Sequence, residues 1–468
     1  MPTDSAPVSP SASLAHFTRT LCNCLGSTAD PMNVLSFTGA GQLPSVFPVT
    51  DLASAAVAVA GLTLAELATP SGEVAPRIRV DRRLASFWFS GSLRPIGWTL
   101  APLWDAVAGD YQAADGWIRL HTNAPHHRAA ALSVLGGVAE RETVVRAAAR
   151  WNASELESAI VEQGGCAAAM RGLNEWSSHP QGKAVQAEPL LDIAFGDEGH
   201  EREWAGTSQR PLHGVRVLDL TRILAGPVAT RFLAGFGAEV LRIDPPGWEE
   251  PGTVPEVVLG KRCARLDLRQ AADRTVFEHL LRHADVLVHG LRPDALERLG
   301  LGAQWRRAIN PTLIDVSLDA YGWTGPWCAR RGFDSLIQMS TGIAAEGMRR
   351  SGREMPVPLP VQAIDHATGY LMAAAALKAL AQRRRDGRGC EVRASLARTA
   401  HWLAQAPSSL DLDPLVPESP QDQSPEIEAT AWGPARRLRP PLSIEGMAMR
   451  WELPAPQLGS SAAAWSGA

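Results

Sequence analysis

The chain has few cysteines and none of the spacings that paired metal ligands or redox cysteines need. Six cysteines are spread over 468 residues, and the closest two, Cys22 and Cys24, form a C-x-C rather than a C-x-x-C. The spacing therefore indicates no zinc site, and a chain of this size needs no disulfide framework. The expected compartment is a reducing cytoplasm.

Long apolar runs and a recognisable secretory signal are also lacking. The longest apolar runs, such as residues 371–380, are shorter than the roughly 20 residues that span a bilayer. The first residues carry no basic segment followed by an apolar one. Net charge is only −4, from 45 basic and 49 acidic residues. We therefore expect neither nucleic acid nor a membrane as a partner.

The usual nucleotide-binding motifs are missing as well. There is no GK[ST] phosphate loop, and the glycine spacing does not fit a dinucleotide fingerprint. Instead, an apolar strand is expected over residues 215–220, followed by a small-residue turn, a helix from Val228 to Phe236 and a strand from Glu239 to Asp244. The backbone N–H groups of such a strand, turn and helix start can hold an anion.

Strand and helix patterns alternate through residues 212–403, which predicts a Rossmann-like, doubly wound parallel sheet. The fold class is therefore α/β. Residues 96–205 form a separate, smaller α+β unit in this interpretation, with a strand–turn–strand over residues 110–121 and helices after it. Five prolines among acids and serines in residues 405–430 are typical of a linker.

Two segments of the chain resemble each other. Pro48-Val49-Thr50-Asp51 and the Ala-rich helix after it are similar to Pro360-Val361-Gln362-Ala363-Ile364-Asp365 and the helix that follows. The two aspartates lie 314 positions apart. The similarity is either a true internal repeat, which the matching Pro-Val and Asp positions favour, or a likeness between two Ala/Leu-rich helices by composition alone.

A run of short motifs follows in order over about 190 residues of the chain. The motifs, in chain order, are Gly214 to Pro227, Glu239-Val240-Leu241-Arg242-Ile243, Gly260-Lys261-Arg262, Leu266-Asp267-Leu268, Ala284-Asp285-Val286-Leu287-Val288, Arg292-Pro293, Asn310-Pro311, Tyr321 to Pro326, Gly332-Phe333-Asp334, Gln338 to Gly342 and Gly387-Arg388-Gly389. This ordered run resembles family III CoA-transferases, the CaiB/BaiF type that also includes alpha-methylacyl-CoA racemases.

The resemblance implies a rearranged domain order, with the small domain ahead of the large one. The segments expected on this basis are a disordered N-terminus with a short helix (1–29), a partial, degenerate half of a large domain (30–95), the small α+β domain (96–205), the large domain (206–404), the linker (405–430) and a C-terminal return to the large domain (431–468). Family members are typically interlocked homodimers. A homodimer is therefore expected, unless the partial first half packs on the large domain as a pseudo-partner.

The resemblance also implies an acyl-CoA transferase that moves CoA between a thioester and a carboxylic acid through an enzyme carboxylate. The CoA thioester is a substrate, and no permanently bound cofactor is expected. Phosphate groups of CoA are expected to meet the following residues: Arg222, Leu224, Ala225, Lys261 and Arg262. The alternative for the arginines and the lysine is that they are solvated charges.

The candidate catalytic residues are Asp334 and Glu354. Family transferases usually carry their nucleophilic aspartate in the loop that corresponds to residues 346–356, but that loop holds no aspartate here, and Glu354 is the carboxylate nearest the expected position. Asp334 matches an aspartate that acts in proton transfer in the racemase branch, where its partner is a histidine, and His289 and His366 are candidates by residue type only. The alternatives are a non-catalytic CoA-binding scaffold and a racemase. No metal is expected, because the spacing of His121, His126 and His127 matches no common site.

Overall fold

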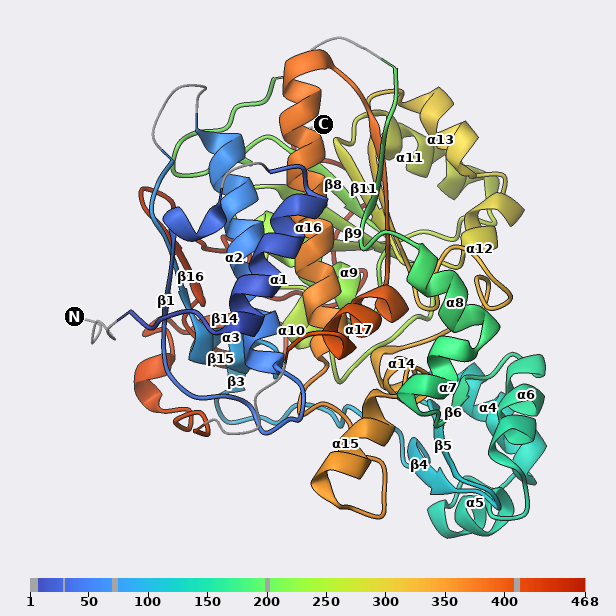
Figure 1. The fold of residues 1–468 in the computed structure, drawn as a ribbon. Coiled ribbons are helices and arrows are strands. Elements are labelled where there is room, and N and C mark those ends of the chain that lie inside the picture. The colour runs from blue at the N-terminus through green and yellow to red at the C-terminus, as the bar shows by residue number, and fades with distance from the viewer. Residues whose placement is uncertain (1–6, 28–29, 70–74, 198–202, 408–412, 468) are drawn as a thin grey trace.

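A seven-stranded, mostly parallel sheet forms the centre of the computed structural model, which describes residues 7–27, 30–69, 75–197, 203–407 and 413–467 (Figure 1). In spatial order the strands are β10 (Lys261–Arg265), β9 (Glu239–Asp244), β8 (Arg216–Asp219), β11 (Val286–His289), β12 (Ile314–Asp319), β13 (Cys390–Ser395) and β7 (Asp192–Phe195). Six strands run parallel, and β7 pairs antiparallel with β13. The predicted doubly wound α/β fold is therefore confirmed.

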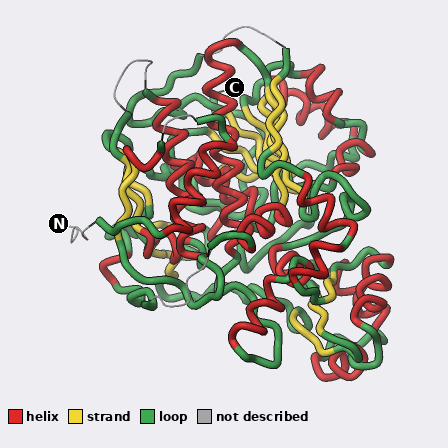
Figure 2. Tube along the Cα trace, viewed as in Figure 1, coloured by secondary structure: helices red, strands yellow, loops and turns green. Residues whose placement is uncertain are grey.

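Helices cover both faces of this sheet (Figure 2). Successive residues of a strand point to opposite faces. Val217 accordingly packs in the core with α9 and α16, while Leu218 packs in the core with α11. The helices of this unit are α9 (Ala225–Gly235), α10 (Val254–Val257), α11 (Ala271–Arg282), α12 (Pro293–Arg298), α13 (Ala303–Ile309), α14 (Asp334–Ser340), α15 (Ile343–Ser351), α16 (Ala363–Asp386) and α17 (Leu396–Ala404).

The smaller unit has its own three-stranded antiparallel sheet and its own apolar core. Its elements are β4 (Gly109–Gln112), β5 (Trp117–Leu120), α4 (Pro125–Leu135), α5 (Arg141–Ala148), α6 (Ala153–Glu162), β6 (Ala167–Ala169), α7 (Leu173–Ser178) and α8 (Pro180–Ala187). The predicted end of this unit at residue 205 was wrong in one respect. Residues 192–195 form β7 of the large sheet, because their backbone completes the exposed edge of β13.

The N-terminal part of the chain packs beside the large unit and adds a second, smaller sheet with the order β1-β2-β16. Its elements are α1 (Ala12–Cys24), a 3₁₀ turn (Pro31–Asn33), β1 (Leu35–Thr38), α2 (Val49–Ala68), β2 (Ile78–Asp81), α3 (Arg82–Trp88) and β16 (Leu442–Ile444). Residues 1–6 of the expected disordered segment lie outside the described residues.

Helix α2 is the one helix in the described part of the chain that is long and apolar enough to cross a membrane by length and composition. Almost all of its residues are buried, and it packs against α1, α3 and α16. A helix that is apolar on every side is expected to be buried in this way inside a globular core.

The segment predicted as a linker is, over its described residues, packed against the N-terminal part of the chain. Asp422 pairs with Arg83, and Glu418 pairs with Arg94. A 3₁₀ turn (Pro420–Asp422) leads to β14 (Glu428–Thr430) and β15 (Gly433–Arg437), and β15 pairs with β3 (Leu93–Pro95). These ion pairs and ladder bonds are the physical reason that residues 413–430 do not behave as a free linker.

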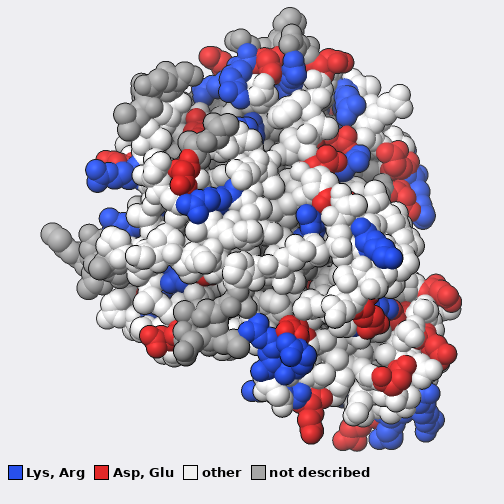
Figure 3. Space-filling model, viewed as in Figure 1, with Lys and Arg blue, Asp and Glu red and all other residues white. Residues whose placement is uncertain are grey.

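The last residues return to the large unit. The indole of Trp465 donates to the carbonyl of Leu280 and lies in the core beneath α11. On the face shown in Figure 3, basic side chains gather over the region of α15, and elsewhere basic and acidic side chains are interspersed.

Candidate active site

The turn after β8 is strained and lies where ligands commonly bind to open α/β sheets. The neighbours of β8 are β9 and β11, so the chain order reverses direction across the sheet at this strand. Ile223 in the turn has φ of 66°, a value that β-branched residues rarely adopt. Its N–H donates to the Glu250 carboxylate over 3.0 Å, so a specific contact holds the strained backbone in place.

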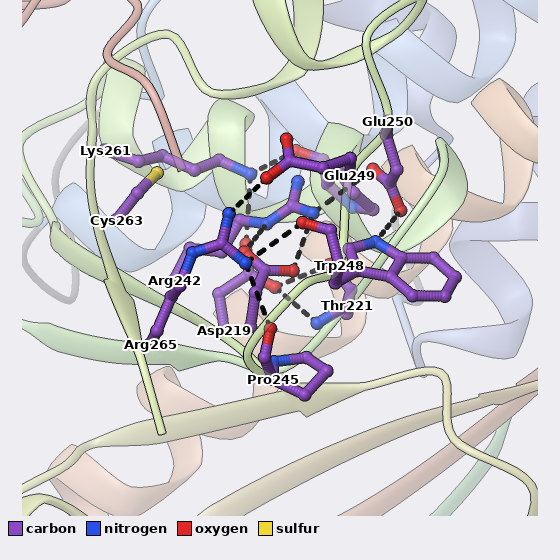
Figure 4. A network of polar contacts seen from close by, with 12 residues as sticks. Asp219, Thr221, Arg242, Pro245, Trp248, Glu249, Glu250, Lys261, Cys263 and Arg265 are labelled. Atoms are coloured by element: carbon purple, nitrogen blue, oxygen red, sulfur yellow. Dashed lines mark hydrogen bonds and ion pairs between the residues drawn. The ribbon is translucent and has the colours of Figure 1, made fainter. Parts of the chain in front are cut away.

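A buried network of polar contacts holds this turn in place (Figure 4). Arg242 is fully buried and binds both Asp244 and Glu250. The indole of Trp248 donates to Glu250 over 2.7 Å, and the guanidinium of Arg222 lies over the Trp248 ring at 4.2 Å. Among the described residues, Nε of Arg222 has no hydrogen-bond partner.

Leu224 is the residue before α9, and Ala225 is the first residue of that helix. The structure therefore brings three of the residues predicted to meet phosphate, Arg222, Leu224 and Ala225, together at the start of a helix. Burial and then the charges of Arg331 and Arg222 lower the pKa of His126. Positive charge thus gathers between this turn and α4, and sequence reasoning had not singled out Arg331.

Lys261 does not reach this site. Its side chain is fully buried, and its ammonium contacts Asp219 (3.0 Å), the Thr230 hydroxyl (2.7 Å) and the Pro227 carbonyl (3.0 Å). An ammonium has three donors, so none is left for a phosphate. The function of this lysine in the structure is to neutralise Asp219 at the base of the turn.

Arg262 is also separate from the turn. It pairs with Glu239 at 3.2 Å and donates to the carbonyl of Ala464 over 2.7 Å. The side chain therefore attaches the C-terminal residues to the outer edge of the sheet.

Two carboxyl groups meet where the starts of α14 and α16 come together. The backbone N–H of Asp365 donates to Oδ2 of Asp334 over 2.9 Å. The side-chain amide of Gln338 donates to Oδ1 of Asp334, and the Gln338 carbonyl oxygen accepts from the N–H of Leu359. Asp334 is 1% exposed and Asp365 is 5% exposed.

Burial raises the pKa of both carboxyl groups. The pKa of Asp334 rises to about 6, although the N–H of Asp365 and the Gln338 amide lower it in part. The pKa of Asp365 is raised well above its usual range by burial and then by the neighbouring charge of Asp334. Two neighbouring buried carboxylates resist ionising together, so the pair loses its protons in coupled steps.

Asp365 is the member of the pair that is available for chemistry. Both oxygens of Asp334 accept hydrogen bonds, whereas the Asp365 carboxyl accepts none from the described residues. Gly369, one helical turn further along α16, approaches α9 so closely that a Cβ would lie 2.4 Å from the Ala225 carbonyl oxygen. Residues four apart share a helix face, so Asp365 lies on the side of α16 that packs against α9.

Glu354 does not take part in this pair. Its side chain is exposed in the loop after α15 and makes no hydrogen bond or ion pair within the described ranges. Sequence reasoning named Asp334 as a catalytic candidate but did not assign Asp365 a catalytic role. The signal that could have identified Asp365 is the internal repeat, because Asp365 is the aspartate at the helix start of the second Pro-Val copy.

Two of the candidate histidines stack on aromatic rings, and the third lies beside a carboxylate. His121 stacks on Phe333 at 3.7 Å, and burial lowers the pKa of His121 to about 3. His366 stacks on Phe89 at 4.8 Å, and His289 lies 3.3 Å from Asp315. Within the described residues, no group of three or more potential ligands could hold a metal ion.

Comparison with known proteins agrees with the sheet and the turn. The model of CoA-transferase family III matches residues 212–439. An acyl-CoA transferase of Fusarium pseudograminearum is 34% identical over 47% of this chain and 53% of its own length. A succinyl-CoA–D-citramalate CoA-transferase of Chloroflexus aurantiacus is 34% identical over 38% of this chain and 48% of its own length.

A crystal structure of a CaiB/BaiF family protein from Brucella suis is 27% identical, with a TM-score of 0.37, and the match covers 48% of this chain and 65% of that one. The chain spans about half the length of the curated relatives it matches. Over residues 212–439 the chain is similar to CoA-transferase family III.

Proposed function

We propose that the protein is an acyl-CoA transferase that moves CoA between a thioester and a carboxylic acid, with Asp365 as the nucleophile. The observation that carries the proposal is the buried Asp334–Asp365 pair at the start of α16, a helix that packs against α9. A carboxylate with a raised pKa is a stronger nucleophile once it has lost its proton. The activities named for the relatives support the same reaction class.

In the proposed reaction, the Asp365 carboxylate attacks the thioester carbonyl, and the C–S bond breaks to give a mixed anhydride and the CoA thiolate. The thiolate then attacks the Asp365 carbonyl, which releases the first acid and forms an enzyme–CoA thioester. The acceptor carboxylate attacks this thioester and releases the thiolate again. Attack of the thiolate on the acceptor's acyl carbon gives the new CoA thioester and restores Asp365.

The phosphate groups of CoA are proposed to lie against Arg222 and the first N–H groups of α9. A guanidinium pairs well with phosphate oxygens, and a helix start adds positive potential. Nε of Arg222, which has no partner among the described residues, is a donor that a phosphate could use. Because the carboxyl pair is buried, neighbouring segments must separate before a thioester reaches it.

A cytoplasmic location is part of this proposal and is supported by the six cysteines, all of which are free thiols. The CoA thioester is treated as a substrate rather than as a resident cofactor.

The test is a transfer assay with a panel of acyl-CoA donors and acids. Asp365→Asn should lower kcat by about a thousandfold or more, whereas the matched change Glu354→Gln should leave it near the wild-type value. Borohydride reduction during turnover should trap the enzyme–CoA thioester as an alcohol on the peptide that contains Asp365. Full transfer by Asp365→Asn would contradict the assignment. Alpha-proton exchange from deuterated water without transfer would indicate a racemase, and CoA binding without either reaction would indicate a scaffold.

A further inference from the structure

The N-terminal part of the chain reproduces one edge of the large sheet. In the large unit β12 and β13 pair in parallel, and β7 adds antiparallel to β13. In the N-terminal sheet β1 and β2 pair in parallel, and β16 adds antiparallel to β2. Helix α16 leads into β13 and α17, as α2 leads into β2 and α3. The internal similarity seen in sequence is therefore matched by topology.

The two helices begin with the same backbone geometry. Pro48 before α2 and Gln362 before α16 both have φ of −77° and ψ of 64°. In each case the first helical N–H donates to the residue before the cap over 2.8 Å. Asp51 and Asp365 are each the third residue of their helix. The constant offset of 314 positions also relates Asp81 to Ser395, which cap α3 and α17.

The two copies pack on each other through equivalent elements. Helices α2 and α16 lie side by side and run in the same direction (Figure 1). Contact between equivalent surfaces of two copies is the arrangement of an isologous dimer interface. Here both copies belong to one chain.

The N-terminal copy also reaches the first turn of α16. Phe89, which is 2% exposed, stacks on His366 at 4.8 Å and on Tyr370 at 6.0 Å. His366 follows Asp365 directly. Nearby, Glu256 of the large unit accepts from the hydroxyl of Ser92 over 2.8 Å and from the N–H of Leu93 over 2.9 Å.

The carboxylate of the N-terminal copy is fully engaged by its own neighbours. Asp51 accepts from Arg82 at 2.7 Å, from the hydroxyls of Ser11 and Ser13 and from the amide of Gln42 at 3.1 Å. At position 396, equivalent to Arg82, the large unit carries a leucine. An ionised carboxylate fixed by this many donors is a poor nucleophile, in contrast with Asp365.

We propose that the N-terminal copy serves as a built-in partner subunit. It covers α16 in the manner of a second chain, positions the first turn of α16 through Phe89, and leaves one reactive carboxylate, Asp365, in each polypeptide. The last part rests on the proposed transferase function, whereas the partner role does not. The protein is then a monomer in place of the homodimer that the resemblance implies.

The first test is the mass in solution, which requires no activity. Light scattering over a hundredfold range of concentration should give a mass near 50.1 kDa throughout. A stable mass near twice that value would overturn the proposal.

Trapping the adduct with borohydride should then give one modified carboxylate per chain, and Asp51→Asn should not change that number. An adduct on Asp51 would also overturn it, whereas no adduct at all would contradict only the transferase function.

The positioning role of Phe89 is tested by substitution. Phe89→Leu should lower kcat about tenfold with little change in KM, because the reacting group is misplaced rather than lost. Phe89→Tyr keeps the ring and should restore most of kcat. The matched control is Phe87→Leu, since Phe87 lies on α3 against Arg83. If circular dichroism shows that the Phe89→Leu variant is folded and its kcat equals that of the wild type, Phe89 has no positioning role.

Discussion

Asp334 accepts the backbone N–H of Asp365 over 2.9 Å, so one carboxylate holds the helix start that presents the other. The contact joins α14 to α16 across 31 positions of sequence. It also places a negative charge beside Asp365 in a buried environment. Asp334 therefore affects both the position of Asp365, the proposed nucleophile, and its proton affinity.

The pH dependence of transfer follows from this pair. The raised pKa of Asp365 predicts that kcat/KM increases with pH above the range in which an ordinary carboxyl group ionises, because only the ionised carboxylate attacks. Asp334→Asn removes the charge that raises the pKa of Asp365, so the midpoint of the profile should move to lower pH. The midpoint of the profile is obtained from steady-state rates measured between pH 5 and 9 with one donor and one acid. A midpoint that stays fixed in Asp334→Asn would contradict the coupling between the two groups.

Arg222 should contribute to CoA binding more than Arg262 does. A hydrogen bond to a charged group is worth about 1.5–3 kcal/mol, so Arg222→Ala should weaken CoA binding by roughly ten- to a hundredfold. The matched change Arg262→Ala should have little effect, because that side chain binds Glu239 and Ala464. Calorimetry with free CoA at two salt concentrations would show the loss and its salt dependence. Equal losses in both variants would place the phosphates elsewhere.

Lys261 should matter for stability and not for CoA affinity. Lys261→Met removes one partner of a buried ion pair and leaves Asp219 without it, which typically costs about 3–5 kcal/mol. Urea unfolding measures the loss in the free energy of unfolding. CoA affinity of the folded fraction should be unchanged within twofold, and a large loss of affinity in a stably folded variant would restore Lys261 as a phosphate ligand.

Glu256 joins the N-terminal copy to the large unit, and its effect on stability should depend on pH. Burial alone would raise its pKa, but Arg231, Arg437 and Ser92 lower the pKa of Glu256 to about 2. A depressed carboxyl pKa contributes stability above the unfolded pKa that disappears as pH falls through the folded pKa. Glu256→Gln should therefore lower the free energy of unfolding by about 3 kcal/mol at pH 7.

The same substitution should cost progressively less between pH 4.5 and pH 2, and denaturant titrations at several pH values would show this. Ser92→Ala serves as a milder control, because it removes one neutral donor and leaves both arginines in place. A pH-independent loss in Glu256→Gln would mean that packing, and not charge, joins the two parts.

The parallel sheet could be predicted because each strand is a short apolar run between turn residues, which is local information. The position of β7 could not be predicted from the sequence, since residues 192–195 lie in a polar stretch and become a strand only by pairing with β13. The environment of Lys261 depends on Asp219, 42 positions earlier. The role of Asp365 likewise depends on a partner on another helix, so the sequence identified the repeat but not the chemistry of its aspartate.

The two copies are joined by one polypeptide, which changes the physics of their association. Subunits of an ordinary dimer separate on dilution, whereas two copies within one chain associate at an effective concentration that dilution does not change. The packing of α2 on α16 therefore does not depend on how much protein a cell makes. An enzyme built in this way would keep its specific activity even at very low abundance.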